Sequence, residues 1–135
     1  MNKILTIIMA MAVTGAAYAG SYDRDALTVD KTVEQDLEFQ FPNDDSIQPE
    51  ISDFAVLNYV TMSNEYGERK VVITLQNTST GNRIFTNDQV MALYANGSRR
   101  VAHEERISFK GKETQTLTLS FAASKYPILK VYTRH

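Results

Sequence analysis

TQTLTLSF, residues 114–121, alternates polar and apolar side chains along its whole length. Leu117, Leu119 and Phe121 fall on one face of an extended chain, and the threonines between them fall on the other. A repeat of two over this length predicts a β-strand with one buried face and one solvated face.

The same reasoning extends to both sides of this stretch. RKVVITLQ, residues 69–76, places Val71, Ile73 and Leu75 inward. FAVLNYVTM, residues 54–62, is apolar on both faces, which is typical of a central strand. Further strands are predicted at DLEFQF (36–41), at Val90 to Ala95, at Arg99 to Phe109 and at ILKVYT (128–133).

Turn-forming residues separate these segments. Asn96-Gly97 is a strong hairpin signal between Val90–Ala95 and Arg99–Phe109. NTSTGN (77–82) and GKE (111–113) are predicted as loops. About seven short strands without a helical period predict an all-β fold, an antiparallel immunoglobulin-like β-sandwich that spans residues 37–135.

The first 19 residues have the three regions of a signal peptide. Lys3 gives a positive start, Ile4 to Val13 is apolar, and Ala17-Tyr18-Ala19 is a cleavage motif before Gly20. A buried helix or a membrane anchor is the alternative, but the apolar core is shorter than the roughly 20 residues that an anchor needs. We therefore expect a bacterial periplasmic or secreted protein without a transmembrane anchor.

The composition sets limits on how the exported chain is stabilised. Cleavage after Ala19 would leave 116 of the 135 residues, enough for one domain with a modest core. The chain has no cysteine, so packing must stabilise the fold without disulfides.

Charge is divided unevenly along the chain. Residues 20–68 carry 12 acidic and 2 basic side chains, whereas residues 69–135 carry 4 acidic and 11 basic ones. Residues 20–36 are predicted as an acidic N-terminal arm or edge strand. Strands from the two halves could interleave and neutralise each other. A basic face shielded by the acidic arm and a head-to-tail contact between copies are the alternatives to this favoured interpretation.

Three motifs occur in order along the second half. Asn77-Thr78-Ser79 ends one strand, Leu93-Tyr94 precedes Asn96-Gly97, and Gly111-Lys112-Glu113 leads to Phe121. Over residues 70–121 this order resembles bacterial exported immunoglobulin-like domains of the FxLYD type, with Ala95 in place of their usual Asp and Lys110 in place of their usual Pro. The resemblance implies the fold and an exported location, and it carries over no catalytic residue.

Candidate catalytic and metal sites are few. Imidazole could come only from His103, in a charged strand, and from His135. Glu104 and Glu105 are neighbours on a strand and point to opposite faces. Asp44-Asp45 lies in a polar loop whose spacing matches no calcium loop. We therefore predict no catalytic residue, no cofactor and no metal site.

A basic hairpin is the candidate binding surface. It carries Arg99, Arg100, Arg106, Lys110 and Lys112. Export argues against nucleic acid as the ligand, so an envelope protein or an anionic envelope component is the expected partner. The sequence thus predicts a non-enzymatic binding or structural module of the cell envelope, and a homo-oligomer is possible. The alternative is a carboxylate-dependent hydrolase that acts on envelope polymers.

Overall fold

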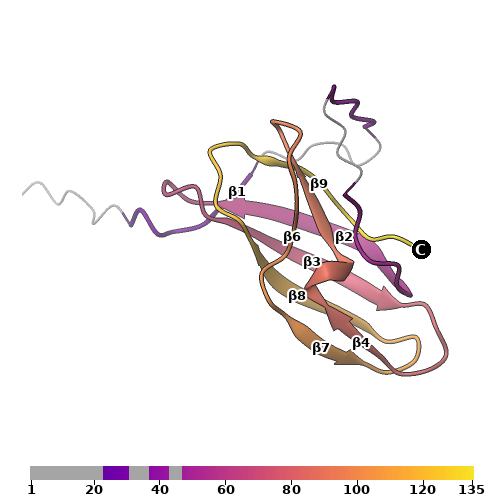
Figure 1. Cartoon of the computed structure of the whole chain (residues 1–135). Coiled ribbons are helices and arrows are strands. Elements are labelled where there is room, and N and C mark those ends of the chain that lie inside the picture. The colour runs from indigo at the N-terminus through magenta and orange to yellow at the C-terminus, as the bar shows by residue number, and fades with distance from the viewer. Residues whose placement is uncertain (1–22, 31–36, 43–46) are drawn as a thin grey trace, which may run out of the picture.

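The computed structural model describes residues 23–30, 37–42 and 47–135 (Figure 1). The described chain is all-β, as the alternation predicts, with one short 3₁₀ turn, η1 (Asn87–Gln89). The predicted signal peptide and the Asp44-Asp45 loop lie outside the described residues. The strands are β1 (Thr28–Val29), β2 (Phe54–Ser63), β3 (Arg69–Asn77), β4 (Arg83–Thr86), β5 (Met91–Tyr94), β6 (Arg99–Val101), β7 (Arg106–Phe109), β8 (Thr114–Phe121) and β9 (Ile128–Tyr132).

These strands pair antiparallel in three sheets. The largest has the order β1-β2-β3-β8, the second pairs β4 with β7, and the third has the order β6-β5-β9. β2 and β3 are consecutive, whereas β8 joins β3 from far along the chain, with Ile73 opposite Leu117. The order of strands in the large sheet therefore depends on long-range pairing.

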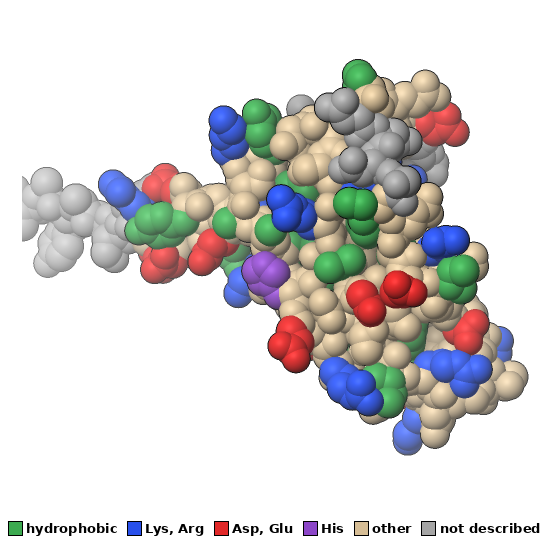
Figure 2. Space-filling view, viewed as in Figure 1, with side chains coloured by type: hydrophobic (Ala, Val, Ile, Leu, Met, Phe, Trp, Pro, Cys, Tyr) green, Lys and Arg blue, Asp and Glu red, His purple; other side chains and the backbone are tan. Residues whose placement is uncertain are grey.

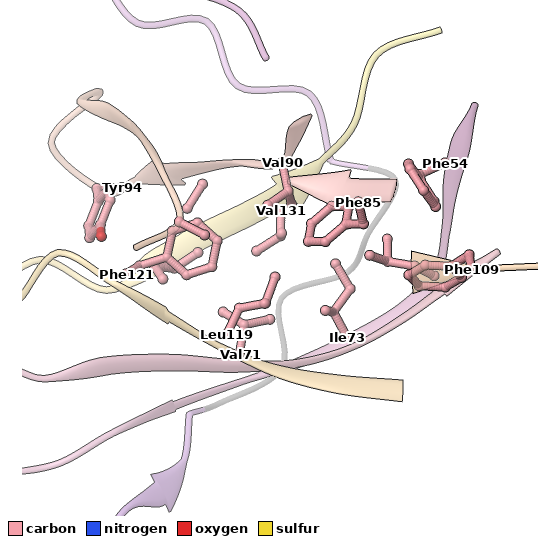
Figure 3. Close-up of a cluster of buried hydrophobic side chains, with 14 residues drawn as sticks. Phe54, Val71, Ile73, Phe85, Val90, Tyr94, Phe109, Leu119, Phe121 and Val131 are labelled. Atoms are coloured by element: carbon pink, nitrogen blue, oxygen red, sulfur yellow. The ribbon is translucent and has the colours of Figure 1, made fainter. Parts of the chain in front are cut away.

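The core lies between the large sheet and the two smaller ones (Figure 3). Val71, Ile73 and Leu119 point from the large sheet toward side chains of the opposite layer, among them Phe85, Val90 and Val131. At one end Phe54, Phe85 and Phe109 meet edge to face, with ring centroids 4.9–6.5 Å apart. Such aromatic contacts add to the stabilisation that comes from burying apolar surface.

The alternation that decides the fold is confirmed in β3 and β8. Val71, Ile73 and Leu75 of β3 are fully buried. Leu119 and Phe121 of β8 are buried too, whereas Leu117 is only half-buried. The exposure of Leu117 shows that the core is open to solvent beside the middle of β8.

The prediction of a strand at residues 36–41 is wrong for its described part. Residues 37–41 form no strand. The rings of Phe39 and Phe41 stack with centroids 6.4 Å apart, and Phe41 lies against Gly97 at the turn between β5 and β6. The apolar spacing here reflects packing of side chains onto that turn, not pairing in a sheet.

The predicted single strand from Arg99 to Phe109 is two strands in different sheets, and the strand β4 opposite its second half was missed. The cause is η1, which interrupts the facing chain between β4 and β5. At this level Asn87 donates a side-chain bond to the Ala102 carbonyl (3.0 Å) and its own amide donates to the Glu105 carbonyl (3.2 Å). These bonds replace ladder pairing, so β6 and β7 separate.

The hairpin predicted at Asn96-Gly97 is confirmed as the connection between β5 and β6. The Gly97 amide donates to the Tyr94 carbonyl (2.9 Å), and the Tyr94 amide donates to the Ser98 carbonyl (2.9 Å). Gly97 has φ +86°, and it is followed by the return strand. This is the three-residue form of hairpin, in which a turn is closed by a left-handed residue.

Replacing Gly97 by alanine is expected to lower the free energy of unfolding by about 1–2 kcal/mol, because a side chain is strained at positive φ. The added Cβ would also lie 3.0 Å from Cγ of Phe41. Urea unfolding of Gly97→Ala, Phe41→Ala and the double variant separates the two causes. Equal midpoints for Gly97→Ala and the wild type would contradict the prediction.

The described part of the acidic arm docks on β2. Thr28 and Val29 pair with Ser63 and Met62, and the Asp30 amide donates to the Thr61 carbonyl (2.9 Å). The Asp30 carboxylate lies 3.7 Å from the guanidinium of Arg69, which is 8% exposed. Arg69 also donates two bonds to the Ser124 carbonyl (3.1 and 2.9 Å), so one buried cation joins the arm to the domain.

A buried asparagine holds two loops together at the other end of the large sheet. The Asn77 side chain is fully buried and donates to the carbonyls of Gly81 (2.8 Å) and Lys110 (3.0 Å). Its Oδ1 accepts from the amide (3.0 Å) and the hydroxyl (2.9 Å) of Ser79. Loop 77–82 and turn 110–113 are therefore locked through one polar side chain whose bonding capacity is filled.

Candidate functional site

The five basic residues proposed from the sequence do not share one strand. Arg99 and Arg100 belong to β6, Arg106 to β7, and Lys110 and Lys112 to the turn before β8. The Arg99 guanidinium donates to the Tyr132 hydroxyl and lies 5.7 Å from the centre of that ring. Arg99 is thus held against β9.

Lys112 has a structural part in its turn. Its φ is +62°, its amide donates to the Ser79 carbonyl (2.9 Å), and its ammonium donates to the Thr78 carbonyl. The Glu113 amide donates back to the Lys110 carbonyl (3.1 Å), which closes the turn. The Lys110 side chain is exposed beside it.

Charges of the two halves of the chain meet in the folded protein. Asp30 and Asp53 of the acidic half lie 3.7 and 2.9 Å from Arg69 and Arg83 of the basic half. Figure 2 shows Lys and Arg interspersed with Asp and Glu on the face toward the viewer. These contacts fit the interpretation in which acidic and basic segments of the two halves of the chain lie side by side and neutralise each other.

The histidine considered in the sequence analysis as a catalytic candidate lies at the surface. His103 is exposed, and its amide donates to the Ser120 carbonyl (2.8 Å). Among residues 23–30, 37–42 and 47–135, no three side chains of His, Asp or Glu are grouped as metal ligands would be. The same part of the chain holds no helix of the length and apolarity required to cross a membrane.

The free edge of β8, on the side away from β3, is the feature that sequence reasoning missed. In an antiparallel ladder the N–H and C=O of alternate residues point to the same neighbour. The Ser120 carbonyl bonds to His103, away from β3, so the main chains of Thr116 and Thr118 point away from β3 as well. The bond between the acidic arm and β2 leads to the same directions for Thr116 and Thr118. The Thr61 carbonyl of β2 accepts from Asp30, so the main chain of Thr61 points away from β3. Alternation through the paired strands β2, β3 and β8 then directs Thr116 and Thr118 away from β3.

The outward main-chain groups of Thr116 and Thr118 have no hydrogen-bond partner among the residues that the structure describes. Both residues are exposed, and β8 and β7 form no ladder. Half-buried side chains of Leu117 on β8 and Ile107 on β7 pack at the margin of the core. The edge therefore offers unpaired donors and acceptors near two partly buried apolar side chains.

The opposite side of the two layers is closed by contrast. There Thr133 donates to the Phe54 carbonyl (2.7 Å), and the Ser52 amide donates to the Arg134 carbonyl (2.9 Å). The β8 side is thus the more open of the two margins.

Two pockets lie near the ends of β8. The larger, about 670 Å³, is lined by residues of β4 and β7 together with Lys110 and Glu113, just before β8. The smaller, about 360 Å³, includes His103, Ser120 and Phe121 at the far end of the strand.

Two tyrosines give the protein a predicted sensitivity to alkali. Burial raises the pKa of Tyr94 above its ordinary value of 10.0, against smaller opposing effects of Arg100 and Arg69. Burial also raises the pKa of Tyr59, opposed by its bond with the Val131 main chain. A raised folded-state pKa contributes stability that is complete below about pH 10 and is lost as the pH rises through the folded value.

We expect the urea midpoint to fall as the pH is raised above 10, and the fall to be shallower in Tyr94→Phe. The variant should be less stable at neutral pH, because the Tyr94 hydroxyl donates to the Ala122 carbonyl (2.7 Å). Urea titrations at several alkaline pH values measure both effects. A slope in Tyr94→Phe as steep as in the wild type would contradict the assignment.

Comparisons with family models, with curated proteins and with solved structures found no match to this chain.

Proposed function

We propose that this protein is an exported, non-enzymatic binding or structural module of the bacterial envelope, and that it binds by accepting an extended strand at the β8 edge. The fold we propose is an immunoglobulin-like sandwich. Its support is that β2, β3 and β8 form one layer while β5 pairs with β9 in the other. The leader-like residues 1–19 and the FxLYD resemblance support export to the periplasm or beyond.

The unpaired main chain of Thr116 and Thr118 carries the proposal. Strand addition at a free edge gains affinity from main-chain hydrogen bonds and specificity from alternate side chains. An added strand would place every second side chain beside Leu117 and Ile107, where the core is half-open. This mode needs no catalytic group and no cofactor.

Three of the five basic residues proposed from the sequence lie near the β8 edge. A partner strand that passes the beginning of β8 reaches the turn that carries Lys110 and Lys112, and Arg106 lies on the neighbouring β7. We propose that these three favour an acidic end in the partner. Arg99 and Arg100, on β6, are left as candidates for an anionic envelope component.

A matched pair of variants at one position tests the function. Thr118→Pro removes an N–H that points away from β3, so it costs the β3 ladder no bond but removes a donor from the edge. Thr118→Ala keeps that N–H and is the control. Both are used to capture proteins from envelope extract after melting curves have shown that they fold.

We expect the wild type and Thr118→Ala to capture the same partner, and Thr118→Pro to lose it. A partner that Thr118→Pro retains would count against strand addition at this edge.

A further inference from the structure

We propose that the β8 edge is the interface of a symmetric dimer of this chain, in which two β8 strands pair antiparallel about a two-fold axis at Leu117. The inference rests on the proposed strand addition and names its occupant as a second copy. Pairing in this way would join the two large sheets into one continuous sheet across the dimer.

The positions of the free main-chain groups fit such an axis. Thr116 and Thr118 both point their N–H and C=O outward, and Leu117 between them points its own toward β3. With the axis at Leu117, Thr116 of each copy faces Thr118 of the other, and each pair exchanges both hydrogen bonds. The same edge is thus its own complement, as an isologous interface requires.

Pairing about this axis would also cover Leu117, which is only half-buried in the single chain. Leu117 would form a non-hydrogen-bonded pair with its own copy, in which the side chains approach most closely. Both leucines lie on the inner face of the sheet and pack against the core, as Ile107 does. Each copy would therefore cover the half-buried Leu117 of the other.

β8 lacks the features that keep an edge strand apart from its own copies. Soluble proteins protect edges with charged side chains, proline, bulges or short strands. The eight residues of β8 include no charged residue, glycine or proline, and the pairing of β8 with β3 runs without a register shift. His103 covers this edge at Ser120, and the stretch that includes Thr116 and Thr118 is left free to pair in solution.

Each end of β8 carries charges of both signs. The start of the strand follows the turn with Lys110, Lys112 and Glu113. At the other end, Ser120 lies opposite Lys70 of β3 and beside His103, which is followed by Glu104 and Glu105. Antiparallel pairing about Leu117 brings the two lysines of one copy toward Glu104 and Glu105 of the other, and Glu113 toward Lys70, whereas parallel pairing would bring each group toward its own copy.

A single introduced thiol tests the axis, because the chain has no cysteine. In Leu117→Cys the two Cα atoms would lie about 4.5 Å apart across the axis, within disulfide range. In Thr116→Cys the equivalent atoms would be about 8 Å apart, beyond the limit of about 7 Å. Mild oxidation of each purified variant is followed by non-reducing electrophoresis.

We expect most of Leu117→Cys to be cross-linked and at least a tenfold smaller share of Thr116→Cys. Sedimentation of the unmodified protein should give twice the chain mass, and Thr118→Pro should shift it to the monomer. A wild-type monomer at all concentrations, or equal cross-linking of both cysteine variants, would overturn the dimer. If the wild type is monomeric and Thr118→Pro still loses an envelope partner, only the dimer fails and the proposed function stands.

Discussion

Asn77→Ala is expected to lower the free energy of unfolding by about 3 kcal/mol or more. The side chain is fully buried and takes part in four hydrogen bonds, two to main-chain carbonyls and two from Ser79. Alanine would remove all four of these hydrogen bonds, each of which contributes about 0.5–1.5 kcal/mol net. The carbonyls of Gly81 and Lys110 would keep one partner each, the Ser79 hydroxyl (2.8 Å) and the Glu113 amide (3.1 Å). Denaturant unfolding followed by circular dichroism measures the loss, together with a fall in Tm of about 10 °C.

Asn96→Ala is the matched control. The Asn96 Oδ1 accepts from the amide (3.1 Å) and the hydroxyl (2.7 Å) of Ser98, as the Asn77 Oδ1 does from Ser79. Asn96 is exposed, however, so water replaces what the substitution removes. We expect a loss of less than about 1 kcal/mol. Equal losses at the two positions would show that burial is not the cause at Asn77.

Gly111→Ala is expected to destabilise the same region by about 3 kcal/mol. A Cβ at Gly111 would lie 2.1 Å from the Thr80 carbonyl oxygen and 2.6 Å from its carbon. Both atoms belong to the main chain of loop 77–82, which the Asn77 side chain fixes in place. The loop must therefore move, and the Asn77 hydrogen bonds to Gly81 and Lys110 must weaken.

Gly81→Ala separates this collision from a general intolerance of side chains in the loop. Its Cβ would meet the Arg83 Nη1 at 3.0 Å, which is the end of a flexible side chain that can turn away. We expect a much smaller loss there. Because Asn77→Ala and Gly111→Ala disturb one network, their combined effect should be less than the sum of the two. Strict additivity would mean that turn 110–113 and loop 77–82 are not coupled.

Sequence periodicity predicted the strands whose two faces differ. β3 and β8 alternate cleanly because one face is buried and the other solvated, and a turn residue marks the hairpin at Gly97. It missed β4, where four residues offer only Phe85 to the core. It also mistook 36–41 for a strand, because aromatic rings that pack on a turn have the same spacing as a strand.

The candidate site could not be predicted from the sequence, since it depends on which strand lies at the end of a sheet and is paired on one side only. TQTLTLSF predicts a strand, but only the pairing of Val71, Ile73 and their neighbours with residues of β8 shows that β8 ends the sheet. The five basic residues are distributed over β6, β7 and the turn before β8 for a related reason. The four residues Ala102 to Glu105 carry the chain from one sheet to another, and no local pattern marks that step.

The order in which the strands pair has a consequence for synthesis. β3 and β5 emerge from the ribosome early, yet their partners β8 and β9 are the last two strands described. The large sheet cannot be completed until Phe121 has been made, and the other layer cannot be completed until Tyr132 has been made. Closing such long loops slows folding. Nascent chains that stop short of β9 should thus stay open to proteases and to holding chaperones. A polypeptide that delays its own folding in this way is well suited to threading through a translocation pore.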